Sequence, residues 1–185
     1  MRIIAGWARS RRLVAPPGAS TRPTSDRVRE ALFNIMGPPP PQTRVLDLFA
    51  GSGGLGLEAM SRGAMSAVFV EKAAPALKCL RQNIEALDLA GDTIVLGDDV
   101  DRALKRLADR EHRFHWVFVD PPYKGGHAEA TLQRLGTGGV ITESASVMVE
   151  HDRRTTLPES VGVLTRSDQR SWGDTTVTFY GRVGA

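Results

Sequence analysis

The motif DPPY at residues 120–123 follows the apolar run 116–119, so it is expected at the carboxyl end of a buried strand. Pro121 and Pro122 lack N–H groups and fix the backbone, which leaves the carbonyl groups around Pro121 as acceptors beside the Asp120 carboxylate. Two acceptors suit the two hydrogens of a planar amino group, and Tyr123 offers a ring on which a base can stack. The motif therefore indicates chemistry at an exocyclic amine, whose nitrogen attacks a methyl group once it becomes pyramidal.

A glycine-rich stretch carries the second chemical pattern. Gly51, Gly53 and Gly56 fit G-x-G-x-x-G between the apolar run 45–49 and a helical pattern. Glu71 ends the next expected strand, where a carboxylate would accept hydrogen bonds from the ribose hydroxyls of an adenosine cofactor. Taken alone, the pattern fits a dinucleotide site, an S-adenosylmethionine loop or a turn that binds no cofactor.

Acidic residues near the glycines narrow this choice. Asp47 lies just before the glycine turn, where it would repel a pyrophosphate but would tolerate a cofactor with an ammonium and a sulfonium. S-adenosyl-L-methionine has both cations, so it is the expected cofactor. Asp98 or Asp99, after the third strand, would accept a hydrogen bond from the adenine amino group or would instead cap the next helix in solvent.

The elements that position these motifs follow from hydrophobic periodicity. Strands are expected at 44–49, 67–70, 93–96, 116–119, 147–150, 161–165 and 175–180, the last two as a hairpin joined through residues 172–174. Helical spacing marks residues 28–35, 55–62, 77–87 and 100–107, with Thr24 or Ser25 and Gly63 as helix boundaries. Glycines at 136, 138 and 139 indicate a loop. The prediction is an α/β, Rossmann-like fold: a mainly parallel seven-stranded sheet with helices on both faces and an antiparallel edge hairpin.

Charge is distributed unevenly along a chain whose net charge is only +3. Residues 1–44 hold eight Arg against Asp26 and Glu30, a net +6, so the remainder carries −3. This basic arm predicts a polyanionic partner, and a solvated basic tail is the alternative. Residues 1–23 also contain the apolar pairs 3–4 and 13–14, which favour a strand or hairpin that packs as structure.

Bulk properties limit the remaining classes. The 185 residues are 41% apolar and 24% charged, as in a globular protein, and no apolar run reaches the roughly 18 residues of a membrane span. We expect a cytoplasmic monomer without a membrane anchor. Cys79, the single cysteine, fits a buried apolar helix position, and His112 and His115 lack the partners of a metal site, so no metal is expected.

Two longer stretches resemble known families. DLFAGSG at 47–53 together with DPPY at 120–123 resembles class I methyltransferases that modify exocyclic amines. RPTSDRVREALFN at 22–34 and VLDLFAGSGGLGLEAMSRGA at 45–64 are similar to the bacterial RsmD family, the 16S ribosomal RNA guanine-N2 methyltransferases. The resemblance runs from residue 3 to residue 181, although WARSRR at 7–12 replaces the usual glycine followed by basic residues.

The resemblance implies a complete set of site residues. For catalysis these are Asp120, Pro121, Pro122 and Tyr123; for the donor, Asp47, Phe49, Gly51, Ser52, Gly53, Glu71, Asp98, Asp99, Arg22 and Thr24; for RNA, Arg2, Arg9, Arg11, Arg12 and Arg22. It further implies a basic, RNA-contacting extension at 1–43, a methyltransferase domain at 44–185, and 16S rRNA as partner within the 30S subunit or its assembly intermediate.

Three alternatives stay open on the motifs. The motifs do not choose guanine N2 over adenine N6 or cytosine N4, nor RNA over DNA or a protein amide. A nicotinamide-dependent oxidoreductase would use the same glycines, yet it would have no use for DPPY. A noncatalytic RNA-binding module would need only the basic arm.

Overall fold

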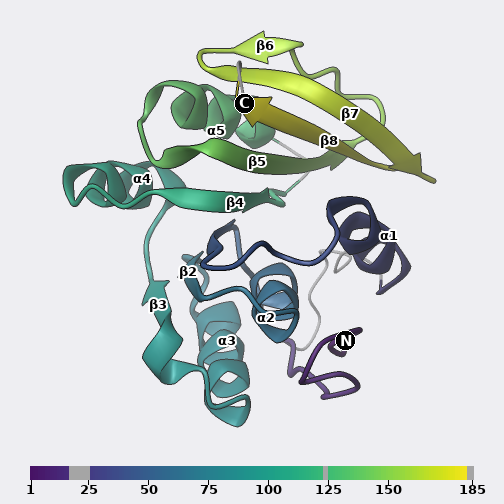
Figure 1. The fold of residues 1–185 in the computed structure, drawn as a ribbon, viewed down its shortest axis with the longest axis vertical. Coiled ribbons are helices and arrows are strands. Elements are labelled where there is room, and N and C mark those ends of the chain that lie inside the picture. The colour runs from purple at the N-terminus through teal and green to yellow at the C-terminus, as the bar shows by residue number, and fades with distance from the viewer. Residues whose placement is uncertain (17–25, 123–124, 183–185) are drawn as a thin grey trace. The chain divides into compact units, whose positions relative to one another are not determined.

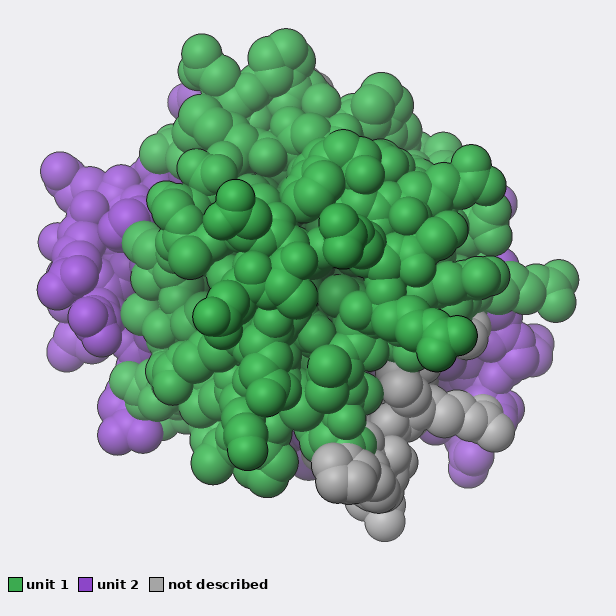
Figure 2. Space-filling model, turned by 90° about the horizontal axis from the view of Figure 1, so that it is seen from below, with its two compact units in different colours: residues 1–99 green, residues 100–185 purple. Residues whose placement is uncertain are grey.

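The structure is a computed structural model that describes residues 1–16, 26–122 and 125–182. The chain forms two compact units, residues 1–99 and residues 100–185, which Figure 2 shows in green and purple. Each unit has its own strands and helices. The division at residue 43 into an extension and a methyltransferase domain stays a prediction.

The first unit is built on a parallel sheet of three strands in the order β3-β2-β1. Its elements are α1 Asp26–Met36, β1 Arg44–Leu48, α2 Gly54–Ser61, β2 Ser66–Val70, α3 Ala74–Ala86, the 3₁₀ turn η1 Ala90–Asp92 and β3 Thr93–Leu96 (Figure 1). Leu48 pairs with Val70, and Val70 pairs with Leu96. The chain therefore leaves all three strands at one edge of this sheet, the carboxyl edge.

Local sequence explains these elements. Strands β1 and β2 are short apolar runs whose inner residues are buried, as expected of parallel strands, whereas Ile94 of β3 is exposed; α2 packs on β1 and β2. Helix α2 ends in a Schellman motif: Gly63, with φ +110°, donates its N–H to the Met60 carbonyl at 3.1 Å, and Ala64 donates to the Ala59 carbonyl at 3.0 Å. Gly63 is thus confirmed as the residue that ends this helix, and Cys79 is buried in α3 as predicted.

The N-terminal segment, residues 1–16, is held on the first unit by both apolar and polar contacts. Ile3, Ala8 and Leu13 are buried, and Arg2 and Arg12 form one antiparallel bridge. The predicted hairpin pair is confirmed only to the extent of this bridge. Thr24 and Ser25, the predicted caps of α1, lie outside the described residues.

The second unit has a mixed sheet of five strands in the order β4-β5-β8-β7-β6. Its elements are α4 Val100–Asp109, β4 Phe114–Val119, α5 His127–Thr137, β5 Ile141–Asp152, β6 Ser160–Val161, β7 Leu164–Trp172 and β8 Thr175–Arg182 (Figure 1). Strands β4 and β5 are parallel, whereas the pairs β5–β8, β8–β7 and β7–β6 are antiparallel. The hairpin through Gly173 and Asp174 is confirmed, and the described residues contain eight strands where seven were expected.

Two predictions for the second unit are wrong. The expected single strand 161–165 is interrupted by a tight turn at Gly162 and Val163, because β6 ends at Val161, Gly162 has φ +57° and β7 begins at Leu164. Residues 127–137, with no element predicted, form α5, and Gly136 lies inside this helix instead of in a loop. A Cβ on Gly136 would lie 2.2 Å from the Val161 carbonyl oxygen, so close packing, which the sequence does not display, accounts for the glycine.

Candidate active site

The glycine loop between β1 and α2 turns through residues with positive φ. Phe49, Gly51 and Gly53 have φ values of +61°, +56° and +89°, and the Gly53 N–H donates to the Ala50 carbonyl at 2.7 Å. Glycine adopts this region without strain, whereas Phe49 does so at a cost of order 1–3 kcal/mol. Backbone strain of this kind clusters at active sites and ligand-binding turns.

The three motif glycines are required for different reasons. Gly51 has no atom within 4 Å of a Cβ built on it, so its backbone faces open space. A Cβ on Gly53 would lie 2.6 Å from Leu80 Cδ1 of α3, and one on Gly56 would lie 2.3 Å from Phe69 Cε1 of β2. Gly53 and Gly56 therefore permit close packing, which leaves Gly51 as the glycine whose backbone a ligand can approach.

Glu71 lies at the carboxyl edge of the sheet, next to this loop. Its Oε2 accepts a hydrogen bond from the Gly51 N–H at 2.9 Å, and its Oε1 accepts one from the Ala73 N–H at 2.7 Å. Each carboxylate oxygen has a second lone pair, so Glu71 retains capacity for the two hydroxyls of a ribose. The structure thus brings the predicted acid and the predicted glycines together.

Asp47 lies beneath the loop and is only 1% exposed. Its Oδ2 accepts a hydrogen bond from the Gly56 N–H at 2.8 Å, which fixes the start of α2 to strand β1. Burial raises the pKa of the Asp47 carboxyl to about 7, the hydrogen bond from Gly56 opposes this rise, and repulsion from Glu71 adds to it. Its observed contact is therefore with the protein backbone.

The remaining donor candidates of the first unit lie around the same edge. Ser52 is buried, and its carbonyl accepts a hydrogen bond from Asn83 Nδ2 at 2.9 Å. Asp98 and Asp99 follow β3 and are half-buried; Asp98 Oδ1 accepts the Asp99 N–H at 2.9 Å. Arg22 and Thr24 lie outside the described residues.

The DPPY motif begins where β4 ends, in the second unit. Val119 is 1% exposed, Asp120 is half-buried, Pro121 is buried and Pro122 is exposed. A buried strand followed by a half-buried acid matches the expectation for Asp120. Tyr123 lies outside the described residues, so its ring placement stays a prediction.

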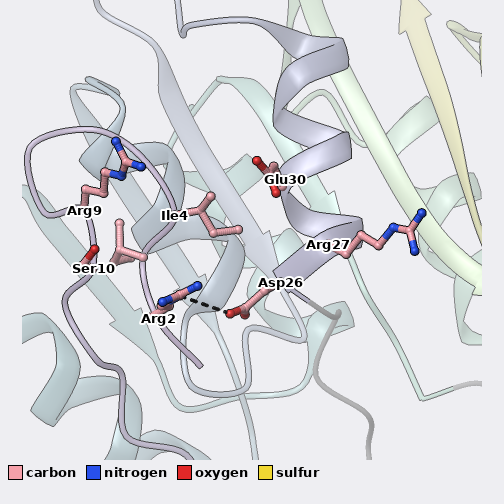
Figure 3. A pocket seen from close by; sticks show the side chains of 8 residues that line it. Arg2, Ile4, Arg9, Ser10, Asp26, Arg27 and Glu30 are labelled. Atoms are coloured by element: carbon pink, nitrogen blue, oxygen red, sulfur yellow. Dashed lines mark ion pairs between the residues drawn. The ribbon is translucent and has the colours of Figure 1, made fainter.

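The arginines of the N-terminal segment lie over a buried face of that segment. Arg2, Arg9, Arg11 and Arg12 are exposed, and Arg2 Nε lies 3.8 Å from Asp26 Oδ2. This segment and α1 line a pocket of about 320 Å³. Figure 3 shows Arg9 on one side of it and Arg27 and Glu30 on the other. Its lining includes none of the donor-loop residues, and its charge is mixed.

Sequence reasoning missed a buried polar cluster that holds the N-terminal segment. Glu58 of α2, 0% exposed, accepts the N–H groups of Ile4 at 2.8 Å and Ala5 at 3.0 Å, and Arg62 Nε donates to it at 2.8 Å. Arg29 of α1 lies with Nε 3.8 Å from Glu58 Oε2 and donates to the Arg2 carbonyl and to Asp26. The signal in the sequence is an acid in the middle of the apolar helix LGLEAM, which predicts a buried partner.

Within residues 1–16, 26–122 and 125–182, no helix is long and apolar enough to cross a membrane. The same ranges hold no group of three or more His, Cys, Asp or Glu side chains that could hold a metal ion.

Comparisons with known proteins agree with this fold and with the motifs of the sequence. A SAM-dependent methyltransferase from Agrobacterium tumefaciens has the same fold, with a TM-score of 0.63 at 16% identity over 95% of this chain and 64% of that one. A hypothetical protein of Thermus thermophilus, TTHA0928, is closer, with a TM-score of 0.84, 31% identity and 99% coverage of both chains. Ribosomal RNA small subunit methyltransferase D of Escherichia coli K12 is 39% identical over 158 residues, 85% of this chain and 78% of that protein.

The α/β fold, the glycine corner and the DPPY motif, together with the 39% identity to a ribosomal RNA methyltransferase, define a class I S-adenosylmethionine-dependent methyltransferase. The model of one family, described as conserved hypothetical protein 95, matches residues 1–181. This chain belongs to that family, the RsmD family.

Proposed function

We propose that this protein transfers the methyl group of S-adenosyl-L-methionine to the exocyclic N2 amine of a guanine in 16S ribosomal RNA. One observation carries the proposal: a chain with Glu71 tied to the glycine loop also has DPPY at the end of β4. A glycine corner alone fits many cofactor enzymes, whereas DPPY fits an acceptor amine. The name of the Escherichia coli relative supports rRNA of the small subunit as the substrate.

The donor is assigned to the carboxyl edge of β1, β2 and β3. Glu71 accepts from the ribose hydroxyls, Asp98 or Asp99 accepts from the adenine amino group, and the loop backbone at Phe49, Gly51, Ser52 and Gly53 lines the donor. Asp47 supports this loop from below through Gly56. Arg22 and Thr24 complete the proposed set.

The acceptor amine is assigned to the DPPY motif. Asp120 and the Pro121 carbonyl accept the two amine hydrogens, which favours a pyramidal N2, and Tyr123 stacks on the base. N2 forms a bond to the methyl carbon as the carbon–sulfur bond breaks, so S-adenosylhomocysteine leaves with the sulfur electron pair. The methylated nitrogen then loses a proton to Asp120 or to water. Positioning supplies most of the rate in this scheme.

We propose that the reaction takes place in the cytoplasm. We also propose that a monomer carries it out, because one chain holds both motifs. The proposed substrate form is the 30S subunit or its assembly intermediate. Incubating naked 16S rRNA and unmodified 30S subunits with labelled donor, and mapping the labelled nucleotide, tests these choices. A label on adenine N6 or cytosine N4 would show that this amine, and not guanine N2, is the acceptor.

The Asp120→Ala variant tests the acceptor role directly. We expect methyl transfer to 16S rRNA to be lost, while the affinity for S-adenosylhomocysteine stays within a few-fold of the unchanged protein, because Asp120 contacts the amine. Asp109→Ala is the matched control, since Asp109 is an exposed carboxylate of the same unit. Equal loss of S-adenosylhomocysteine binding in Asp120→Ala would refute the assigned role.

A further inference from the structure

Asn83 joins two parts of the first unit that are far apart in the sequence. It belongs to α3 and is 2% exposed. Its Oδ1 accepts the Val14 N–H at 2.8 Å, and its Nδ2 donates to the Val14 carbonyl at 2.9 Å and to the Ser52 carbonyl at 2.9 Å. One side-chain amide thus binds the end of the N-terminal segment and the glycine loop at once.

These three hydrogen bonds place strict demands on the residue type. An amide side chain has two N–H donors and one carbonyl acceptor, and here both donors and the acceptor are used. An aspartate would keep the bond from the Val14 N–H but would lose both donors, including the one to Ser52. No smaller residue reaches both partners, because alanine and serine lack the amide nitrogen.

Other residues of the N-terminal segment bind α2, the helix that follows the glycine loop. Glu58 accepts the N–H groups of Ile4 and Ala5, and Ser61 accepts the N–H groups of Trp7 at its carbonyl and Ala8 at its hydroxyl. Figure 1 shows this segment beside α2 and α3. The glycine loop is therefore bounded by two attachments of the segment, one at Asn83 and one along α2.

We infer that Asn83 is a positioning residue that couples occupancy of the N-terminal segment by RNA to the conformation of the donor-binding loop. The inference rests on the proposed function, in which the segment contacts RNA and the loop holds the donor. RNA bound to the segment stabilises the arrangement in which Val14 and Ser52 share the Asn83 side chain, and that arrangement fixes the loop that holds the donor. By thermodynamic linkage, the donor then strengthens RNA binding by the same factor.

The test measures the factor by which each ligand strengthens the binding of the other, and not the stability of the protein. The Kd of S-adenosylhomocysteine is determined with and without saturating unmodified 30S subunits, the proposed substrate form, and the Kd of the subunits with and without S-adenosylhomocysteine. We expect the unchanged protein to show at least about 5-fold mutual strengthening, the lower end of typical coupling. In Asn83→Ala and in the near-isosteric Asn83→Asp, the factor should fall below about 2-fold.

Asn34→Ala is the matched control, since Asn34 is an exposed asparagine of α1 in the same unit, and it should keep the full factor. A merely structural Asn83 would weaken both ligands or lower the Tm without changing the ratio, and that result overturns the inference. So does an unchanged protein that binds both ligands independently, a measurement that needs no variant. An unchanged protein that binds neither S-adenosylhomocysteine nor the 30S subunit would instead overturn the proposed function.

Discussion

At the scale of single residues, the carboxylate of Asp47 has an environment that opposes its charge. It is buried beneath the glycine loop with one backbone donor from Gly56, and burial raises its pKa from 3.8 to about 7. The folded chain therefore holds a proton that the unfolded chain has released between about pH 4 and pH 7. Stability from this group is complete below pH 3.8 and is lost as pH rises through about 7.

Asp47→Asn should remove this pH dependence, because the amide is neutral at every pH and its oxygen still accepts the Gly56 N–H. We expect the free energy of unfolding of the variant, relative to the unchanged protein, to rise between pH 4 and pH 8 by at most about 4 kcal/mol. Urea unfolding across this range measures the difference. Asp92→Asn, at an exposed position, is the control, and a pH-independent difference for Asp47→Asn would contradict the raised pKa.

Glu71 has a structural contact as well as a proposed ligand contact. Glu71→Ala should weaken S-adenosylhomocysteine binding by about 1.5–3 kcal/mol, the range for hydrogen bonds to a charged group, and the protein should still fold. Isothermal titration calorimetry gives the affinity, and a thermal melt checks the fold. Glu85→Ala, which removes an exposed carboxylate from α3, should change neither. Unchanged affinity in Glu71→Ala would show that the ribose is held elsewhere.

At the scale of elements, prediction succeeded where the pattern is local. The strand β3 has the predicted bounds, and Glu71, Asp98 and Asp120 follow strands as expected, since an apolar run ending in an acid is visible within a few residues. The glycine at position 136 was interpreted as part of a loop, so the helix α5 was missed. The residue that requires a glycine there is Val161, which is distant in the chain. Glu58 and Asn83 were missed for the same reason: the backbone groups of the N-terminal segment that they bind are 53 to 69 residues away.

Gly136→Ala tests this account of α5. Alanine stabilises an ordinary helix interior relative to glycine by about 1 kcal/mol. Here its Cβ would lie 2.2 Å from the Val161 carbonyl oxygen, so we expect destabilisation of about 1–3 kcal/mol, as for an overpacked core. Gly91→Ala is the control, because nothing lies within 4 Å of its added Cβ. A more stable Gly136→Ala in urea unfolding would mean that β6 moves away freely.

At the scale of the whole molecule, the basic N-terminal segment is held in place by buried contacts. The exposed arginines of the N-terminal segment lie over Ile3, Ala8 and Leu13, which are buried, and over the hydrogen bonds to Glu58. The arm therefore has two parts: its backbone and apolar side chains pack as structure, and the side chains of Arg9, Arg11 and Arg12 are exposed where a polyanion could contact them. Deleting the segment would expose the Glu58 carboxylate, so substitution of side chains is the cleaner experiment.

The variant Arg9→Gln, Arg11→Gln, Arg12→Gln removes three exposed charges and keeps the buried face of the segment. Each phosphate contact contributes about 0.7 to 0.9 to the slope of log affinity against log salt, so the slope for 16S rRNA should become shallower by about two to three units. S-adenosylhomocysteine affinity should not change. The control Lys105→Gln, Arg106→Gln, Arg110→Gln removes the same charge from exposed positions in and just after α4. If the control flattens the salt slope equally, net charge alone governs binding and the N-terminal arginines do not contact RNA; an unchanged slope in both would exclude phosphate contacts at either place.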